Sequence, residues 1–177
     1  MWDKYNTFEY EKSPASHLSV NGAQLIINPS ASPFCIGKQK VRNKVLEGNT
    51  KRFNSPIVYV NQVGAHNDLI FDGSSCVVNG KGEKVSTLDT FKEDVQYIHF
   101  KNGEITDTSE DETNPEAEEI KLIHDALVFG IKDYFKKMNF KTATLGSSGG
   151  IDSAVVQALT STALGGDKVH PVLMPSK

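Results

Sequence analysis

The chain has 177 residues, of which 38% are hydrophobic and 23% charged, and its formal net charge is −3. These values suit one globular domain or two small ones, and the sequence has neither an apolar run long enough to cross a membrane nor clustered positive charge for nucleic acid. Two cysteines make no disulfide framework, and residues 1–13 lack the basic start and apolar core of a secretory signal, so we expect a cytoplasmic location.

The first half of the chain combines predicted strands with one helix. An apolar run at 24–28 (QLIIN) predicts a buried strand, and 38–53 predicts a helix with Val41, Val45 and Leu46 on one face. PIVYVN at 56–61 predicts a second strand, opened by a proline whose missing N–H does little harm there. Further strands are predicted in DLIFDG, in SSCVVNGKGEKVSTL around a turn at 80–82, and in DVQYIHF at 94–100.

A polar and acidic stretch at 101–114 (KNGEITDTSEDETN) has too few apolar side chains to form a core, so we expect a linker there. The next helix is predicted to begin with Asn114 as N-cap and Pro115 at its first position, and Asn139 is predicted to close it. Its apolar residues recur at helical spacing, which predicts core packing for Ile120, Ile123, Leu127, Ile131, Tyr134 and Met138.

The last part of the chain predicts one βαβ unit. Strands are expected at 142–146 (TATLG) and 169–174 (VHPVLM), with a helix at 153–164 between them. This order implies a parallel pair of strands with a right-handed crossover. Pro171 lacks the N–H that a central strand needs, which favours an edge position or an early end of the strand.

The loop between the first of these strands and the helix, SSGGID, has the features of an anion site. Backbone N–H groups and the positive end of the helix dipole converge there. Gly149 and Gly150 permit close approach of a phosphate, and the Ser148 and Ser153 hydroxyls can donate to its oxygens. Asp152 could cap the helix or hold Mg²⁺ against the phosphates. The Walker and G-x-G-x-x-G patterns are absent, and the pattern present is S-G-G-x-D-S.

The stretch SGGIDS resembles the pyrophosphate-binding signature of the PP-loop ATP pyrophosphatases, which cleave ATP to AMP and pyrophosphate while adenylating a substrate. Its neighbours IHDALVFGIKDYFKK and VLMPSK resemble NAD synthetase. Two earlier segments, NGAQLIINPSASPFCIGK and PIVYVNQVGAHNDLIFDGSS, resemble the late part of a nitrilase-type glutaminase domain. This order of domains is that of glutamine-hydrolysing NAD synthetases, and the resemblance covers nearly the whole chain.

The resemblance implies an α/β fold in two parts. Residues 1–100 would be the C-terminal half of a nitrilase-like αββα sandwich, and 101–114 an acidic linker. Residues 115–177 would hold the first βαβ unit of a Rossmann-like PP-loop ATP pyrophosphatase domain.

The implied reaction is the ATP-dependent amidation of deamido-NAD to NAD, with ammonia from glutamine, in an enzyme that commonly forms large homo-oligomers. Ser32 and Lys38 match positions that bind glutamine, and a hydroxyl and a cation suit its α-amino and carboxylate groups. Asp152 matches a Mg²⁺-ligand position. The ATP segment matches Gly146, Ser147, Ser148, Gly149, Gly150, Ile151, Asp152 and Ser153.

The resemblance also implies that the catalytic triad lies outside these residues. Nitrilase-type amidases use a Glu–Lys–Cys triad, and the family's Cys-Glu-Asp-x-Trp stretch matches only Met1-Trp2 here, so the nucleophile and its partners are expected upstream. Cys35 has no acid beside it and Cys76 lies in a strand pattern, so neither is expected to be the nucleophile. We therefore expect an internal piece of a longer enzyme that is inactive alone.

Three other functions fit part of the sequence. Another PP-loop amidotransferase, such as GMP synthetase, would share SGGIDS but normally carries a different glutaminase. A stand-alone carbon–nitrogen hydrolase would explain NPSASPF but not SGGIDS. A non-catalytic remnant would keep the folds as a binding module.

Overall fold

The computed structural model describes residues 13–106 and 119–174. By their internal contacts these residues form two compact units, one of residues 13–63 and 71–106 and the other of residues 64–70 and 119–174. The expected start of the helix at Asn114 and Pro115 lies outside the described residues. None of the helices in the described ranges is long and apolar enough to cross a membrane.

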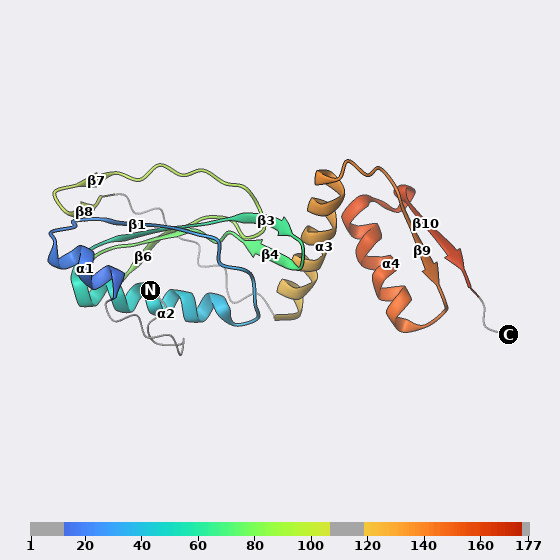
Figure 1. Ribbon diagram of the computed structural model, residues 1–177, viewed down its shortest axis with the longest axis horizontal. Coiled ribbons are helices and arrows are strands. Elements are labelled where there is room, and N and C mark those ends of the chain that lie inside the picture. The colour runs from blue at the N-terminus through green and yellow to red at the C-terminus, as the bar shows by residue number, and fades with distance from the viewer. Residues whose placement is uncertain (1–12, 107–118, 175–177) are drawn as a thin grey trace. The chain divides into compact units, whose positions relative to one another are not determined.

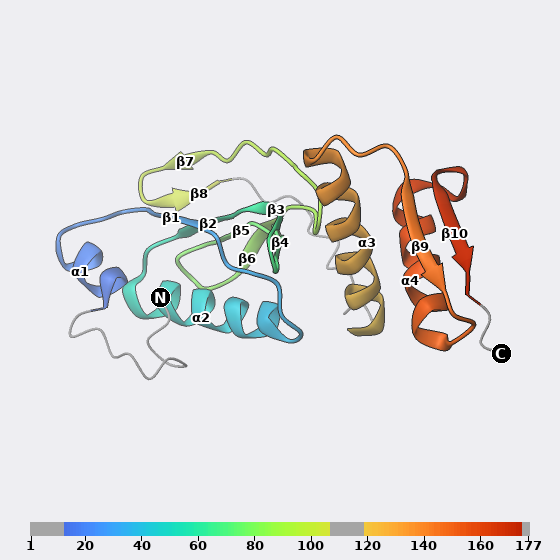
Figure 2. The same cartoon turned by 45° about the vertical axis from the view of Figure 1, so that its right-hand side comes forward.

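The first unit is built on a four-stranded mixed sheet in the order β1-β2-β5-β6. Figure 1 labels its two outer strands, β1 and β6. Strand β1 (Ile26–Ser30) runs parallel to β2 (Ile57–Asn61), and β5 (Cys76–Val78) pairs antiparallel with both β2 and β6 (Lys84–Thr87). Helices α1 (Pro14–Val20) and α2 (Lys38–Phe53) lie on one face of this sheet (Figure 2). The sheet and these helices enclose a core of Ala15, Ile26, Leu46, Ile57, Tyr59, Cys76 and Val78.

Helix α2 shows how its sequence produces the fold. Leu46 is fully buried and Thr50 lies one turn later on the same face, while the opposite face carries lysines. The helix begins after Gly37, whose φ of +74° suits a residue without a Cβ, and ends at Asn54 with a φ of +48°. These bounds match the predicted helix.

The second unit contains the predicted βαβ arrangement. Helix α3 (Glu119–Lys137) packs against α4 (Ile151–Leu164), and strands β9 (Ala143–Ser147) and β10 (Val169–Leu173) pair in parallel. A short 3₁₀ turn, η1 (Gly166–Lys168), precedes β10. Pro171 pairs opposite Leu145 and is exposed, and β10 is an edge strand among the described residues, as its proline predicts.

A hairpin from the first half of the sequence also belongs to the second unit. Strands β3 (Val63–His66) and β4 (Leu69–Asp72) pair, and the tip, residues 64–70, contacts α3. A Cβ added at Gly130 of α3 would lie 3.0 Å from the Ile70 side chain. The sequence pattern did not predict this hairpin as part of the later unit.

Four sequence predictions differ from the structure at least in part. Residues 94–99 form no strand and Tyr97 is 86% exposed, although the His99 carbonyl accepts a hydrogen bond from the Thr106 N–H at 3.1 Å. Phe100–Lys101 (β7) pairs with Glu104–Ile105 (β8), so a short hairpin lies where the linker was expected to begin. The strand expected in QLIIN buries Ile26 but leaves Ile27 exposed among the described residues. The apolar stripe of α3 is packed only in part, because Ile123 and Ile131 are half-buried whereas Ile120, Leu127, Tyr134 and Met138 are exposed.

Candidate functional site

The glycine loop of the second unit connects the end of β9 to the start of α4. Ser148, Gly149 and Gly150 are all exposed, and Gly149 has a φ of +84°, which favours glycine. Gly150 is the N-cap residue of α4 and offers no side-chain cap, so the first backbone N–H groups of a 14-residue helix remain open to a ligand. An exposed loop of this kind at a helix N-terminus attracts anions.

Two serine hydroxyls hold the loop in shape. Ser148 Oγ lies 3.2 Å from Ser153 Oγ, and it accepts a hydrogen bond from the Gly150 N–H at 3.4 Å. Ser153 Oγ in turn donates to the Gly150 carbonyl at 2.9 Å. The two hydroxyls therefore lie together at the start of α4. From the sequence, we expect both of them to donate to one bound anion.

The end of β10 runs close to the loop. The Met174 N–H donates to the Ser147 carbonyl at 2.9 Å. A Cβ added at Gly146 would meet Met174 Sδ at 2.7 Å, so a side chain at Gly146 would displace Met174. Gly146 and Ser147 thus lie next to the loop, although neither has a charged side chain to offer a ligand.

Asp152 and Ile151 occupy the first turn of α4, and both are exposed. Asp152 is a single carboxylate, since no group of three or more potential metal-ligating side chains occurs in the described ranges. Mg²⁺ is commonly held by one or two carboxylates together with substrate phosphates and waters. The position of Asp152 beside an anion site therefore fits a Mg²⁺ ligand only when phosphates supply further oxygens.

The other predicted site lies in the first unit, just beyond β1. Ser32 is buried, and its backbone is held at both polar groups by one side chain. Its N–H donates to Asn61 Oδ1 at 2.8 Å, and its carbonyl accepts from Asn61 Nδ2 at 3.2 Å. Asn61 ends β2, so the turn after β1 is fixed to the neighbouring strand by a side-chain bridge.

Arg42 connects this turn to helix α2 and strand β4. Its guanidinium donates to both carboxylate oxygens of Asp72, at 3.1 and 3.2 Å, and to Ser32 Oγ at 3.4 Å. Asp72 also accepts from Asn61 Nδ2 at 3.0 Å. The four residues form a polar network in which each is at most 6% exposed, and Arg42 also donates to Gln39 Oε1 at 2.7 Å.

Lys38, the other predicted glutamine ligand, is the first residue of α2 and is half-buried. Arg42 lies one helical turn later, where it reaches Ser32. The structure thus joins Ser32 to α2 through Arg42. Of the two cysteines, Cys35 is exposed in the same segment and Cys76 is buried in β5.

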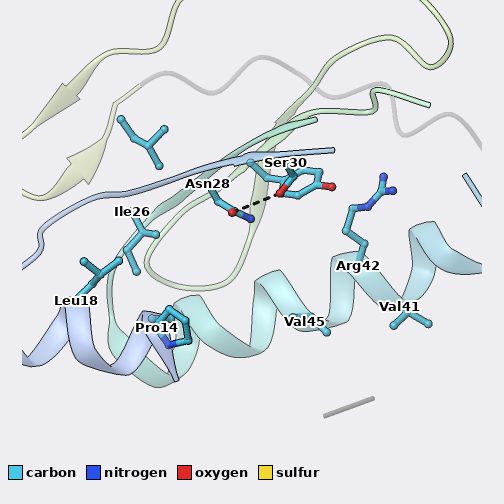
Figure 3. A pocket seen from close by; sticks show the side chains of 11 residues that line it. Pro14, Leu18, Ile26, Asn28, Ser30, Val41, Arg42 and Val45 are labelled. Atoms are coloured by element: carbon cyan, nitrogen blue, oxygen red, sulfur yellow. Dashed lines mark hydrogen bonds between the residues drawn. The ribbon is translucent and has the colours of Figure 1, made fainter. Parts of the chain in front are cut away.

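A cavity of about 230 Å³ adjoins this network (Figure 3). Its walls come from α1, β1 and α2, and Figure 3 shows Arg42 and Val45 of α2 beside Asn28 and Ser30 of β1. Ser30 Oγ donates to Asn28 Oδ1 at 3.4 Å. The Tyr59 ring also lines the cavity, with the Arg42 guanidinium 5.3 Å from its centre. Burial raises the pKa of the Tyr59 phenol, although Arg42 opposes the shift.

Sequence reasoning missed Arg42, Asn61 and Asp72. One signal was present in the sequence, because Arg42 lies four residues before Leu46 and therefore on the buried face of the predicted helix. A cation on such a face requires a buried acid. The identity of that acid depends on a pairing across 30 residues, which periodicity does not reveal.

Comparisons with known proteins show which family the chain is similar to. A family model described as NAD synthase matches residues 123–177. The glutamine-dependent NAD(+) synthetases of Synechocystis sp. and Acinetobacter baylyi are 40% and 38% identical over 94% and 89% of this chain. A solved glutamine-dependent NAD⁺ synthetase from Acinetobacter baumannii, in complex with ADP, aligns with 90% of the chain at a TM-score of 0.83 and 36% identity. The chain spans about 30% of the length of these relatives.

Proposed function

We propose that this chain takes part in the reaction of glutamine-dependent NAD(+) synthetases, because it is similar to them along about nine-tenths of its length. In that reaction ATP adenylates deamido-NAD, and ammonia from glutamine displaces AMP to give NAD, with pyrophosphate as the other product. Residues 146–153 would bind ATP, and Ser32 with Lys38 would bind glutamine. The enzyme would be a carbon–nitrogen ligase that acts on soluble substrates.

The observation that carries this proposal is the geometry of the loop at the start of α4. The start of α4 has no side-chain cap, and the hydroxyls of Ser148 and Ser153 lie 3.2 Å apart at the same helix end. A pyrophosphate has several negatively charged oxygens, which such a set of donors can bind together. The ADP complex of the Acinetobacter baumannii relative supports a nucleotide as the ligand.

Asp152 would supply one carboxylate to Mg²⁺ bound with the nucleotide. The metal would neutralise part of the charge on the phosphates, which otherwise repel the Asp152 carboxylate beside them. The chain's own contribution is the position of Asp152 in the first turn of α4, next to the serine pair.

Two domains would divide this work. Residues 1–100 would belong to a nitrilase-type glutaminase domain and residues 115–177 to a PP-loop synthetase domain, with 101–114 between them. In the first domain, the Ser32 hydroxyl and the Lys38 cation would bind the polar groups of the amino acid.

Binding of ATP and of pyrophosphate to the purified chain tests the proposal, by calorimetry in the presence of Mg²⁺. We expect saturable binding that weakens about tenfold in a Ser148→Ala/Ser153→Ala variant, because two donors to the phosphates are lost. Thr162→Ala is the matched control, since Thr162 is an exposed hydroxyl near the other end of the same helix. Equal binding by all three proteins would refute the loop as the ATP site.

A further inference from the structure

The four-residue network of Ser32, Arg42, Asn61 and Asp72 draws on four separate parts of the fold. Arg42 comes from α2, Asn61 from the end of β2 and Asp72 from the end of β4. Asn61 and Arg42 bond directly to Ser32, and Asp72 bonds to both of them. Because this network connects α2, β2 and β4 to Ser32, it fixes the position of Ser32.

Asn61 performs this task with a defined orientation. Its Oδ1 accepts from the Ser32 N–H, and its Nδ2 donates both to the Ser32 carbonyl and to Asp72. The opposite orientation of the amide would place Oδ1 against two acceptors and Nδ2 against a donor. Asp72 therefore favours the same orientation of Asn61 that the Ser32 N–H and carbonyl require, and it strengthens the hold of Asn61 on the Ser32 backbone.

Stability alone is a poor explanation for the Arg42–Asp72 pair. Both side chains are buried, and removing two charges from water costs about as much as their attraction returns, so apolar residues of similar size often do as well or better. In addition, Arg42 Nε has no hydrogen-bond partner in the part of the chain that the structure describes. The pair is better explained by the geometry that it imposes.

We propose that Asp72, acting through Asn61 and Arg42, is the positioning residue that holds Ser32 in place for binding glutamine. The proposal rests on the glutamine-binding function proposed above for Ser32. Arg42 donates to Ser32 Oγ, which leaves the hydroxyl to act as a donor toward an acceptor oxygen of the ligand. Asn61 fixes the backbone on either side of that hydroxyl.

The deciding variant replaces the ion pair with apolar residues, Arg42→Met together with Asp72→Leu. We expect its free energy of unfolding to stay near that of the wild-type chain. The Ser32 amide should nevertheless exchange with solvent at least about tenfold faster, because Asn61 has lost the acceptor that orients it. Glutamine, titrated into the ¹⁵N-labelled chain and followed by the Ser32 and Lys38 amide signals, should bind about tenfold more weakly.

Two further variants make the test independent of folding defects. Asn61→Ala removes both side-chain bonds to the Ser32 backbone without adding a charge beside Asp72, and it should also speed Ser32 exchange and weaken glutamine binding. Thr50→Ala is the control, because Thr50 is buried in the same helix and bonds only to Glu47 in the same turn, so it should lower stability and leave the Ser32 signals unchanged.

The outcomes separate the two proposals. Wild-type rates of Ser32 exchange in the Arg42→Met/Asp72→Leu variant, or wild-type affinity for glutamine in it, would overturn the positioning role. If the wild-type chain shows no response to glutamine, the glutamine site itself fails, and Ser32 exchange still decides whether the network holds the turn.

Discussion

The carboxylate of Asp133 accepts a hydrogen bond from the backbone N–H of Ala65 at 2.7 Å, across 68 residues of sequence. Lys137, one turn further along α3, donates to the Ala65 carbonyl at 2.7 Å and pairs with Asp133 at 2.5 Å. Two side chains of α3 therefore bind both polar groups of one residue at the tip of the β3–β4 hairpin. This contact places residues 64–70 in the second unit.

Asp133→Asn should destabilise the chain in a pH-dependent way. Burial alone would raise the pKa of Asp133, but hydrogen bonds from Lys137 and Ala65 outweigh it and lower the pKa below 3.8. A lowered pKa in the folded state means that the carboxylate stabilises the fold above about pH 4 and stops doing so as the pH falls through the lowered value. We expect a loss of about 1 kcal/mol at pH 7, measured by urea unfolding, and a smaller loss at an acidic pH at which the carboxylate is protonated in the folded state.

The control for this measurement is Asp125→Asn, which removes a more exposed carboxylate from the same helix. It should change the free energy of unfolding by less than Asp133→Asn at pH 7. An Asp133→Asn effect of equal size at both pH values would contradict the assigned role of the carboxylate.

Gly73→Ala should be among the more damaging single substitutions in the first unit. Gly73 has a φ of +66°, and a Cβ there would lie 2.6 Å from Val63 Cγ2 and 3.4 Å from the Asp89 carbonyl. Gly22 has a similar φ of +85° but open space around it, so Gly22→Ala measures the backbone strain alone. We expect Gly73→Ala to cost roughly 1–3 kcal/mol more than Gly22→Ala in thermal or urea unfolding. Equal costs would show that Val63 moves aside freely.

Leu46→Ala tests the core between α2 and the sheet. Leu46 is 0% exposed, and its truncation should cost about 2–5 kcal/mol through lost burial and the cavity left behind. Ile27→Ala removes a similar side chain that is 65% exposed on the other face of β1, and it should cost well under half as much. Comparable losses for the two variants would mean that the second face of β1 is also covered in solution.

Asp152→Asn should reduce the effect of Mg²⁺ on ATP binding. In the wild-type chain Mg²⁺ is expected to strengthen binding, since it relieves repulsion between Asp152 and the phosphates. Without Mg²⁺ the variant should bind ATP as well as or better than the wild type, because one like charge is gone. Calorimetry with and without Mg²⁺ decides this, and Asp167→Asn, an exposed acid after α4, is the control. A variant that keeps the full Mg²⁺ enhancement would exclude Asp152 as a ligand.

Sequence patterns predicted the elements whose bounds depend on residues nearby in the chain. The bounds of α2, the αL residue Asn139 after α3 and the edge position of β10 at Pro171 all follow from nearby residues. The predictions failed where the partner lies far away in sequence. DVQYIHF has the alternation of a strand, but in the described part of the chain only its last residue, Phe100, pairs with a strand, and four side chains of the apolar stripe of α3 are exposed.

The loop at 148–153 was predicted in more detail than the Ser32 site. All of its hydrogen bonds join residues at most five apart, so one short motif contains its geometry. The network around Ser32 joins residues 10 to 30 apart on different elements, and only Ser32 itself was singled out from the sequence. Whether Ser32 and Lys38 bind glutamine stays a prediction.

The hairpin tip also has a consequence for how the chain is made. On the ribosome Ala65 is synthesised 68 residues before Asp133, which at about 5–20 residues per second is a delay of roughly 3–14 s. During that time the tip of the hairpin exists without the helix that binds it. The second unit can therefore be completed only after α3 has been synthesised. Until then the nascent chain must keep residues 64–70 available to bind that helix.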